Sequence, residues 1–237
     1  MQVTQTEIQK GFVKEHRVTR PAARLAGYTA IGGCITMIIG AALWGTSGTD
    51  LWAALDSGDM AGYLAAVAGV KGQLVANLSI WIIGVLILGV AGNVLAGLSQ
   101  QRLGFSQAAQ VCYQVAVPLV IVSYIAMLSL VVQLAGDTSE TAVAIGNVLG
   151  WVGTRADDLA TALILGAGPL FITLANRSSW MPVWLIRWGY LSGLVGLFSV
   201  AVHYVAGMGA FGFLILPVGM GWMIATGIVL LRGTPNK

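Results

Sequence analysis

The residues whose types and spacing best suit chemistry are two adjacent carboxylates, Asp157 and Asp158, which closely follow Arg155. A histidine beside carboxylates near neutral pH could relay protons or bind a cation, and His203 is a candidate for that partner. His203 lies twenty positions after Val183, about 30 Å along a helix, which places it at a depth similar to that of Asp158. These four polar residues therefore form a candidate outer polar site.

Each of these groups also has a structural interpretation. Residues 154–157 have the spacing of a capping box, in which a hydroxyl and a carboxylate satisfy free backbone N–H groups at a helix start. His203 could equally hydrogen-bond lipid headgroups or backbone. Asp158 is harder to explain by capping, because it shares a helical face with Thr161 and Leu165 that could look into a bundle.

A second candidate set consists of amide side chains that we name the glutamine stripe. Gln107, Gln110 and Gln114 recur at spacing i, i+3 and i+7, and Asn93 and Asn176 lie at comparable depth on neighbouring helices. Amides on one stripe could line a hydrated inner vestibule. They could equally hold helices together, since interhelical hydrogen bonds in membranes contribute about 0.6 kcal/mol each on average.

The sequence argues against tightly bound cofactors, metals and a catalytic centre. Cys34 and Cys112 lie 78 positions apart without a CxxC pair, so we expect neither a disulfide nor a thiolate metal site. Only His16 and His203 could ligate haem, and His16 lies in a charged tail. All four lysines lie outside the apolar runs, which argues against a Schiff base within the membrane. The sequence also lacks P-loop, zinc-protease and serine-hydrolase motifs, which disfavours an enzyme.

The composition identifies the class of protein. Of the 237 residues, 57% are hydrophobic and 9% are charged, whereas soluble domains carry about 25% charged residues. The mean hydropathy is +0.84, and runs of about 18 or more apolar residues can each cross a bilayer as one helix. These values exclude a soluble enzyme, a disulfide-stapled secreted domain, a disordered protein and a nucleic-acid binder.

Six apolar runs predict an all-α membrane helix bundle with six transmembrane helices in one domain. Pro118, Pro169 and Pro217 fall inside the third, fourth and sixth runs, where each removes a backbone donor and is expected to kink its helix. The predicted spans are 25–44, 74–98, 108–134, 158–174, 183–204 and 209–231, between a basic tail at 1–24 and a short tail at 232–237.

Lysine and arginine predict the orientation of the chain. With a cytoplasmic amino terminus, ten of the twelve basic residues lie inside, and Lys71 and Arg155 lie outside. This asymmetry predicts a plasma-membrane protein with both termini in the cytoplasm. A basic segment before an apolar run can also be an export signal, but this run continues past Cys34 to Trp44, so we expect an uncleaved first span.

Two outer segments are too short to span. Between the first two spans, Ser57 is a candidate N-cap for an amphipathic helix that ends near Gly72 and lies on the outer membrane face. Residues 141–152 are expected to form a re-entrant or surface helix leading into the fourth span. Gly146 and Gly150 could let that helix pack tightly on another.

The start of the fifth span combines an arginine with aromatic residues. Arg187 lies close to Trp180, Trp184 and Trp188, so we expect it to extend toward the inner headgroups beside an aromatic belt. The glycine-rich stretch that begins at Gly189 favours close packing of this span against a neighbouring helix.

Three stretches carry a resemblance to a known family: residues 20–27 (RPAARLAG), 58–65 (GDMAGYLA) and 181–187 (MPVWLIR). On these stretches the chain resembles an uncharacterised bacterial family of six-helix integral membrane proteins, a domain of unknown function. The resemblance implies a six-span fold. It implies no activity and transfers no site residues.

The leading hypothesis is a non-enzymatic structural, accessory or sensor-like membrane component with no cofactor. It would contact the lipid bilayer and pack against membrane-protein partners or further copies of itself through glycine-rich helix faces. The first alternative is a small-solute or ion permease, with Asp158 and His203 as an outer gate and the glutamine stripe as an inner vestibule. The second is a membrane-embedded enzyme, which would need Asp157, Asp158 and His203 to meet in a cavity.

Overall fold

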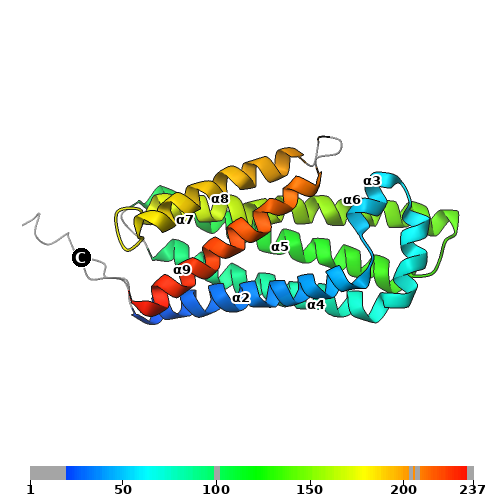
Figure 1. The fold of residues 1–237 in the computed structure, drawn as a ribbon, viewed down its shortest axis with the longest axis horizontal. Coiled ribbons are helices and arrows are strands. Elements are labelled where there is room, and N and C mark those ends of the chain that lie inside the picture. Colours follow the sequence, from blue (N-terminus) through cyan, green and yellow to red (C-terminus); the bar gives the residue numbers. More distant parts are fainter. Residues whose placement is uncertain (1–19, 99–101, 203–204, 206–208, 234–237) are drawn as a thin grey trace, which may run out of the picture.

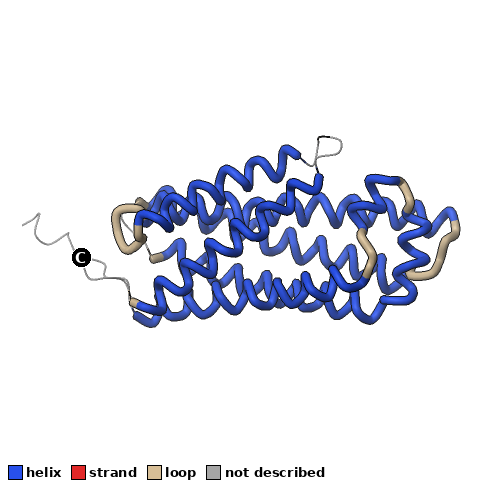
Figure 2. The backbone as a smooth tube through the Cα atoms, viewed as in Figure 1, coloured by secondary structure: helices blue, strands red, loops and turns tan. Residues whose placement is uncertain are grey.

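The computed structural model describes residues 20–98, 102–202, 205 and 209–233, and within them the chain is a bundle of helices without a strand (Figures 1 and 2). Six helical segments are long and apolar enough to cross a membrane, which confirms the predicted all-α, six-span fold. The elements are α2 (Arg20–Ser47), α3 (Leu51–Ser57), α4 (Met60–Gly97), α5 (Leu103–Leu134), α6 (Glu140–Ala162), η1 (Leu163–Ala167), α7 (Gly168–Asn176), α8 (Val183–Val202), η2 (Gly209–Leu214), η3 (Leu216–Met220) and α9 (Gly221–Arg232).

The spans run up and down, so their termini gather at two ends of the bundle (Figure 1). At one end the start of α2 meets the end of α9, where Gly27 packs against Leu231. The Arg102 guanidinium donates to the Ser178 hydroxyl over 3.4 Å and joins the α4–α5 and α7–α8 connections at that end. We name it the arginine end, because it carries Arg20, Arg24, Arg102, Arg177, Arg187 and Arg232. The opposite end is named the acidic end, and it carries Asp50, Asp56, Asp59, Asp137 and Glu140.

The spans differ in length, and the difference accumulates at the acidic end. Helix α8 has 20 residues and the last span, Phe211–Arg232, has 22, which matches an apolar layer of about 30 Å. The second, third and fourth spans have 38, 32 and 37 residues. All of them reach the arginine end. Helix α4 bends at Val70, whose backbone is not helical, so its first turns run across the acidic end, while α5 and the fourth span extend beyond α8 there by roughly 20 Å. We name this part, formed by α3 and the first turns of α4 and α6, the acidic projection (Figure 1).

Glycines set the closest helix contacts in the bundle. A Cβ on Gly196 of α8 would lie 2.6 Å from the Gly166 Cα of η1, so the two backbones touch. Gly189 and Gly193, on the same face, pack against Thr173 and Leu170. The predicted close packing of the fifth span is therefore confirmed. These glycines contact other helices of the same chain, so they do not form a surface for a partner.

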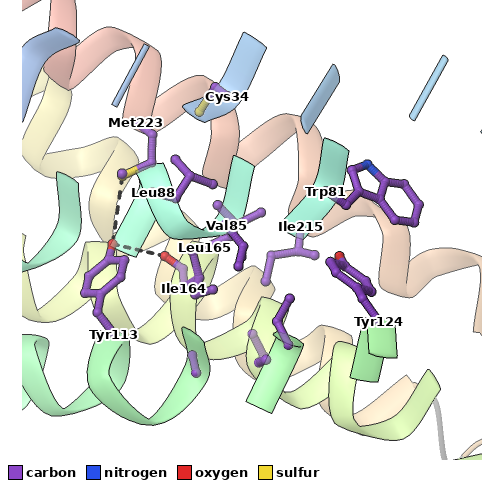
Figure 3. Close-up of a cluster of buried hydrophobic side chains, with 14 of the residues drawn as sticks. Cys34, Trp81, Val85, Leu88, Tyr113, Tyr124, Ile164, Leu165, Ile215 and Met223 are labelled. Atoms are coloured by element: carbon purple, nitrogen blue, oxygen red, sulfur yellow. Dashed lines mark hydrogen bonds between the residues drawn. The ribbon is translucent and has the colours of Figure 1, made fainter. Parts of the chain in front are cut away.

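Side chains that donate hydrogen bonds to backbone carbonyls of neighbouring helices add a second kind of contact. Figure 3 shows one case, in which the Tyr113 hydroxyl reaches the Ile164 carbonyl from among buried apolar side chains. Ten such bonds connect different elements among the described residues, so many of the polar side chains pair one helix with another. They are Cys34 to Met220 (3.7 Å), Lys71 to Val132 (2.7 Å), Gln73 to Leu43 (2.7 Å), Asn77 to Gly40 (2.7 Å), Trp81 to Met37 (3.1 Å), Ser106 to Ala96 (2.5 Å), Tyr113 to Ile164 (3.1 Å), Ser123 to Gly153 (2.7 Å), Trp188 to Val218 (3.0 Å) and Trp222 to Leu185 (3.1 Å). The hydroxyls of Thr173, Ser192 and Thr226, by contrast, are buried without a hydrogen-bond partner among the described residues.

Two of the three intrahelical prolines adjoin π-helical turns. Pro217 lies within η3, and Pro169 lies two positions after the last residue of η1. A wider turn shifts the hydrogen-bond register, and a carbonyl in each π segment accepts a side-chain donor from another helix: Ile164 in η1 and Val218 in η3. The third proline, Pro118, lies within the uninterrupted helix α5.

The acidic projection differs from the prediction in three respects. Asp59, rather than Ser57, caps α4, because its carboxylate accepts the Gly62 N–H, while Ser57 ends the unpredicted helix α3. The apolar face of the first turns of α4 packs on protein, where Gly146 of α6 contacts Met60, so it does not rest on a membrane surface. Residues 141–152 belong to α6, which continues into the fourth span. The predicted close packing at Gly146 and Gly150 is confirmed.

Candidate functional site

An ion pair on α6 is the centre of the candidate site. The Arg155 guanidinium donates to Asp158 Oδ2 over 3.0 Å, and the two side chains are 27% and 13% exposed. The i, i+3 spacing on a helix brings the two side chains to the same face. Arg155 also lies over the Trp151 ring, 4.4 Å from its centroid, so its charge is shared between a carboxylate and an aromatic face.

Helix α3 positions the second partner of Asp158. The Trp52 indole N–H donates to Asp158 Oδ1 over 3.2 Å, across 106 positions of sequence. Asp50 holds α3 in place locally, since its carboxylate accepts the Ala53 N–H at the N-cap. Both oxygens of Asp158 therefore accept hydrogen bonds, one from a cation and one from an indole.

Asp157 faces a different set of groups. The Tyr124 hydroxyl of α5 lies against its carboxylate, and Asp158 is the nearest like charge. Oδ1 of Asp157 is buried and has no hydrogen-bond partner among the described residues. An oxygen in that condition is a free acceptor for a proton or a cation.

Aromatic rings from five elements close the space beside the two carboxylates. Trp44, Trp52 and Phe213 contact one another with ring centroids 6.2 Å apart in each pair. Trp81 bridges to Tyr124 at 5.4 Å, as Figure 3 shows for these two side chains. Because the rings contact one another, they fill the space between them.

The capping box predicted for Thr154 and Asp157 is wrong. Helix α6 begins at Glu140 with Ser139 as its N-cap, so both residues lie within the helix. The Thr154 hydroxyl donates back to the Gly150 carbonyl over 2.9 Å, a bond typical of threonine inside a helix. The role assigned to Asp157 by capping therefore has no basis in the fold.

His203 lies outside the described residues, as do residues 1–19 of the predicted tail 1–24 and residues 234–237 of the second tail. The structure brings together the other three members of the predicted outer site, Arg155, Asp157 and Asp158, within one turn of α6. The meeting of Asp158 with His203 stays a prediction.

The glutamine stripe does not face the interior of the bundle. Gln107 and Gln114 are exposed and Gln110 is half-buried. The two asparagines are engaged locally: Asn93 donates to the Gly89 carbonyl on its own helix over 2.8 Å, and Asn176 donates to Ile172 and accepts from the Trp180 indole. Amides from the three helices therefore do not converge on an inner vestibule within this chain.

The predicted aromatic belt is only partly exposed. Trp184 and Arg187 are exposed, whereas Trp180 is buried against Asn176 and Trp188 is half-buried with its indole on the Val218 carbonyl. Two of these three tryptophans therefore pack on the chain itself.

Sequence reasoning missed Trp52, Tyr124 and the aromatic rings around them. Trp52 lies in a seven-residue helix that carries no periodic signal, and Tyr124 lies in a continuous apolar run. No spacing rule connects either residue to α6. The one usable signal was that Trp52 follows Asp50, a favoured N-cap residue, by two positions.

Comparison with known proteins gives no assignment, since no protein-family model, no curated protein and no solved structure matches the chain. The site is therefore interpreted from its own chemistry as a half-buried ion pair and a partly unpaired carboxylate beside a group of contacting aromatic rings in a six-span membrane protein.

Proposed function

We propose that this multi-pass membrane protein is a non-enzymatic structural or accessory component, which acts by packing against other membrane proteins rather than by conducting a solute. The observation that carries the proposal is that two glutamine side chains of α5 point away from the bundle. Gln107 and Gln114 face outward from the bundle, where they are available to a partner. The interior is occupied by helix-to-helix contacts, such as those of Asn77 and Tyr113 with neighbouring carbonyls.

We also propose that the arginine end faces the cytoplasm of a bacterial plasma membrane. Support comes from the described charges, since six arginines lie at one end, whereas the carboxylates of the acidic end are accompanied by Lys71 and Arg155. Positively charged loops are retained on the cytoplasmic side. An impermeant maleimide applied to whole cells should label Glu140→Cys, and it should label Arg177→Cys only after the membrane is opened. The reverse pattern would overturn the orientation.

Native electrophoresis of mildly solubilised membranes tests the proposed role. A carboxyl-terminally tagged chain should migrate in a complex larger than the monomer in at least the gentlest detergents. Migration as a monomer in every detergent, together with no cross-linked product in intact membranes, would contradict an accessory role.

A permease is the second candidate, and the unpaired oxygen of Asp157 is the observation that favours it. An acceptor near the acidic end could receive a proton or cation that then passes an outer gate of Asp158 and His203. Uptake measured in proteoliposomes should then fall in the double variant Asp158→Asn, His203→Ala. Unchanged uptake would remove the gate.

A further inference from the structure

We infer that the exposed face of α5 binds the same face of a second copy of this chain, with Gln114 of each copy hydrogen-bonded to the other within the apolar layer. This inference rests on the proposed function, and it names the partner and the surface. The surface, which we name the α5 face, consists of exposed residues that follow one another in steps of three and four along the helix. They are Gly104, Gln107, Val111, Gln114, Pro118, Val122 and Ile125.

The depth of Gln114 can be taken from the helices around it. The start of α5 and the start of α8 lie at the same end, because Arg102 is bonded to Ser178. Gln114 lies twelve positions after Arg102, about 18 Å along the helix. It is therefore level with the middle of α8, near Leu194, and α8 is only as long as the apolar layer is thick.

An amide at that depth needs a partner that lipid tails do not supply. Gln114 is exposed, its neighbours Val111 and Val115 are 56% and 52% exposed, and no hydrogen bond joins its side chain to another described residue. Water is absent from the hydrocarbon layer, so an unpaired amide there is costly and favours association with a polar group on another helix.

The chemistry of the α5 face points to a second copy as that partner. Copies of one chain insert in the same orientation, so a twofold axis between them runs along the membrane normal and brings each residue near the axis opposite itself. An amide is both donor and acceptor, and it can pair with an identical amide, which a carboxylate or an ammonium cannot do. Gln107, one repeat of seven below Gln114, would meet its own copy in the same way.

The other residues of the α5 face suit close contact between helices. No charged side chain lies on it from Gly104 to Ile125, and a Cβ on Gly104 would meet nothing within 4 Å. The β-branched residues Val111 and Val122, 56% exposed each, flank Gln114 and Pro118 on this face, and their stiff side chains lose little freedom on packing. Glycine-rich faces, by contrast, are occupied within the chain, as at Gly166 and Gly196.

Cysteine cross-linking in native membranes tests the geometry. We expect Gln114→Cys and Val111→Cys to form disulfide-linked dimers on mild oxidation, because equivalent residues meet at the axis. Leu194→Cys on α8 is the matched control, since it lies at similar depth and Leu194 is 66% exposed. Cross-linking at residue 194 as fast as at 114 would overturn the inference.

Association of the purified full chain in phosphatidylcholine vesicles tests the amide. Gln114→Leu should weaken dimerisation, measured by energy transfer between labelled copies, by about threefold to twentyfold, the range of measured membrane hydrogen bonds. Gln133→Leu, the same change on the same helix at the acidic end, should leave it unchanged. Both residues are exposed, so neither change removes core packing, and the elution profile of each variant checks its fold. Equal dimerisation of Gln114→Leu and the unaltered chain would overturn the inference.

Two other occupants of the α5 face are separated by the same measurements. A lipid would use the open hollow of about 560 Å³ beside it, lined by Arg102, Leu103, Gly104, Phe105, Ala108 and Phe171, and would leave a monomer in vesicles with no dimer at residue 114. A different protein would give a large complex in native membranes but a monomer after purification. Either result would show that a second copy does not occupy the α5 face. The proposed function would be contradicted only if the chain were a monomer in native membranes too.

Discussion

Glycines of the bundle and glycines of the acidic projection differ in how much space surrounds them and in what they contact. In the bundle, a methyl group on Gly196 would lie 2.6 Å from backbone, which cannot move without shifting a helix. In the projection, a methyl group on Gly146 or Gly150 would lie 3.2 Å from the flexible side chains of Met60 or Leu55. The bundle therefore depends on one fixed arrangement of backbones, whereas the projection has side chains that can adjust.

The largest effect is expected where backbones touch. Gly196→Ala should lower the free energy of unfolding by about 3 kcal/mol or more, because the methyl group has no space to enter. In a chain of this size that loss corresponds to a fall of roughly 6 to 12 °C in Tm. Thermal unfolding in detergent measures it. Gly32→Ala is the control, since its methyl group meets nothing within 4 Å and alanine favours a helix; an equal loss in both variants would contradict the account.

A smaller effect is expected at the ion pair that lies where the bundle meets the projection. Asp158→Asn should cost about 1 to 3 kcal/mol, because Arg155 loses its carboxylate within a half-buried site. Trp52→Phe should cost less, since it removes one donor and keeps the ring. Because asparagine keeps an acceptor oxygen, the coupling is measured with Asp158→Ala, Trp52→Phe and their double variant, and strictly additive losses would show that the Trp52–Asp158 bond contributes nothing.

Gly146→Ala tests the other half of the comparison, the glycine contacts of the acidic projection. The added methyl group presses on Met60, a flexible side chain, while alanine gains about 1 kcal/mol of helix propensity over glycine. These terms oppose each other, so the net change in unfolding free energy should stay within about 1 kcal/mol. Thermal unfolding beside Gly196→Ala is the measurement. A loss as large as that of the bundle variant would remove the distinction between the two regions.

The smallest effect is expected at the exposed start of α6. Asp137 accepts the Ser139 N–H over 2.9 Å, which lowers the pKa of its carboxyl in the folded chain. A lowered folded-state pKa stabilises the fold above the unfolded value near 4 and loses that stabilisation as the pH falls through the folded value. Asp137→Asn should therefore unfold slightly earlier than the unaltered chain at pH 6, and the difference should shrink as the pH falls below about 4. A difference that grows on acidification would contradict this assignment.

The sequence predicted the spans but not what their polar residues contact. Runs of apolar residues determine where helices cross, so the six spans and the close packing of α8 through its glycines could be predicted. The fourth span was expected at 158–174, but its helix runs from Glu140 to Asn176. Residues 141–152 are too few to span by themselves, and only their contacts with α3 and α4 explain why they continue the helix.

The candidate site was predictable in its residues but not in its partners. Arg155 and Asp158 share one turn, and helical spacing alone pairs them. The bond from Trp52 joins residues 106 positions apart, and no local rule predicts it. The outward direction of Gln107 and Gln114 was equally hidden, because a helical stripe shows which residues share a face but not which way that face points.

A structure of the full chain in a lipid bilayer tests most directly the claim that the chain acts by packing against another copy rather than by conducting a solute. The two regions to compare are the α5 face and the interior of the bundle. The account predicts a second copy packed on the α5 face with Gln114 at the contact, and an interior closed by the contacts of Asn77, Tyr113 and Trp222. Lipid along the whole α5 face, together with a continuous water-filled cavity from Asp158 to the arginine end, would contradict it and favour the permease.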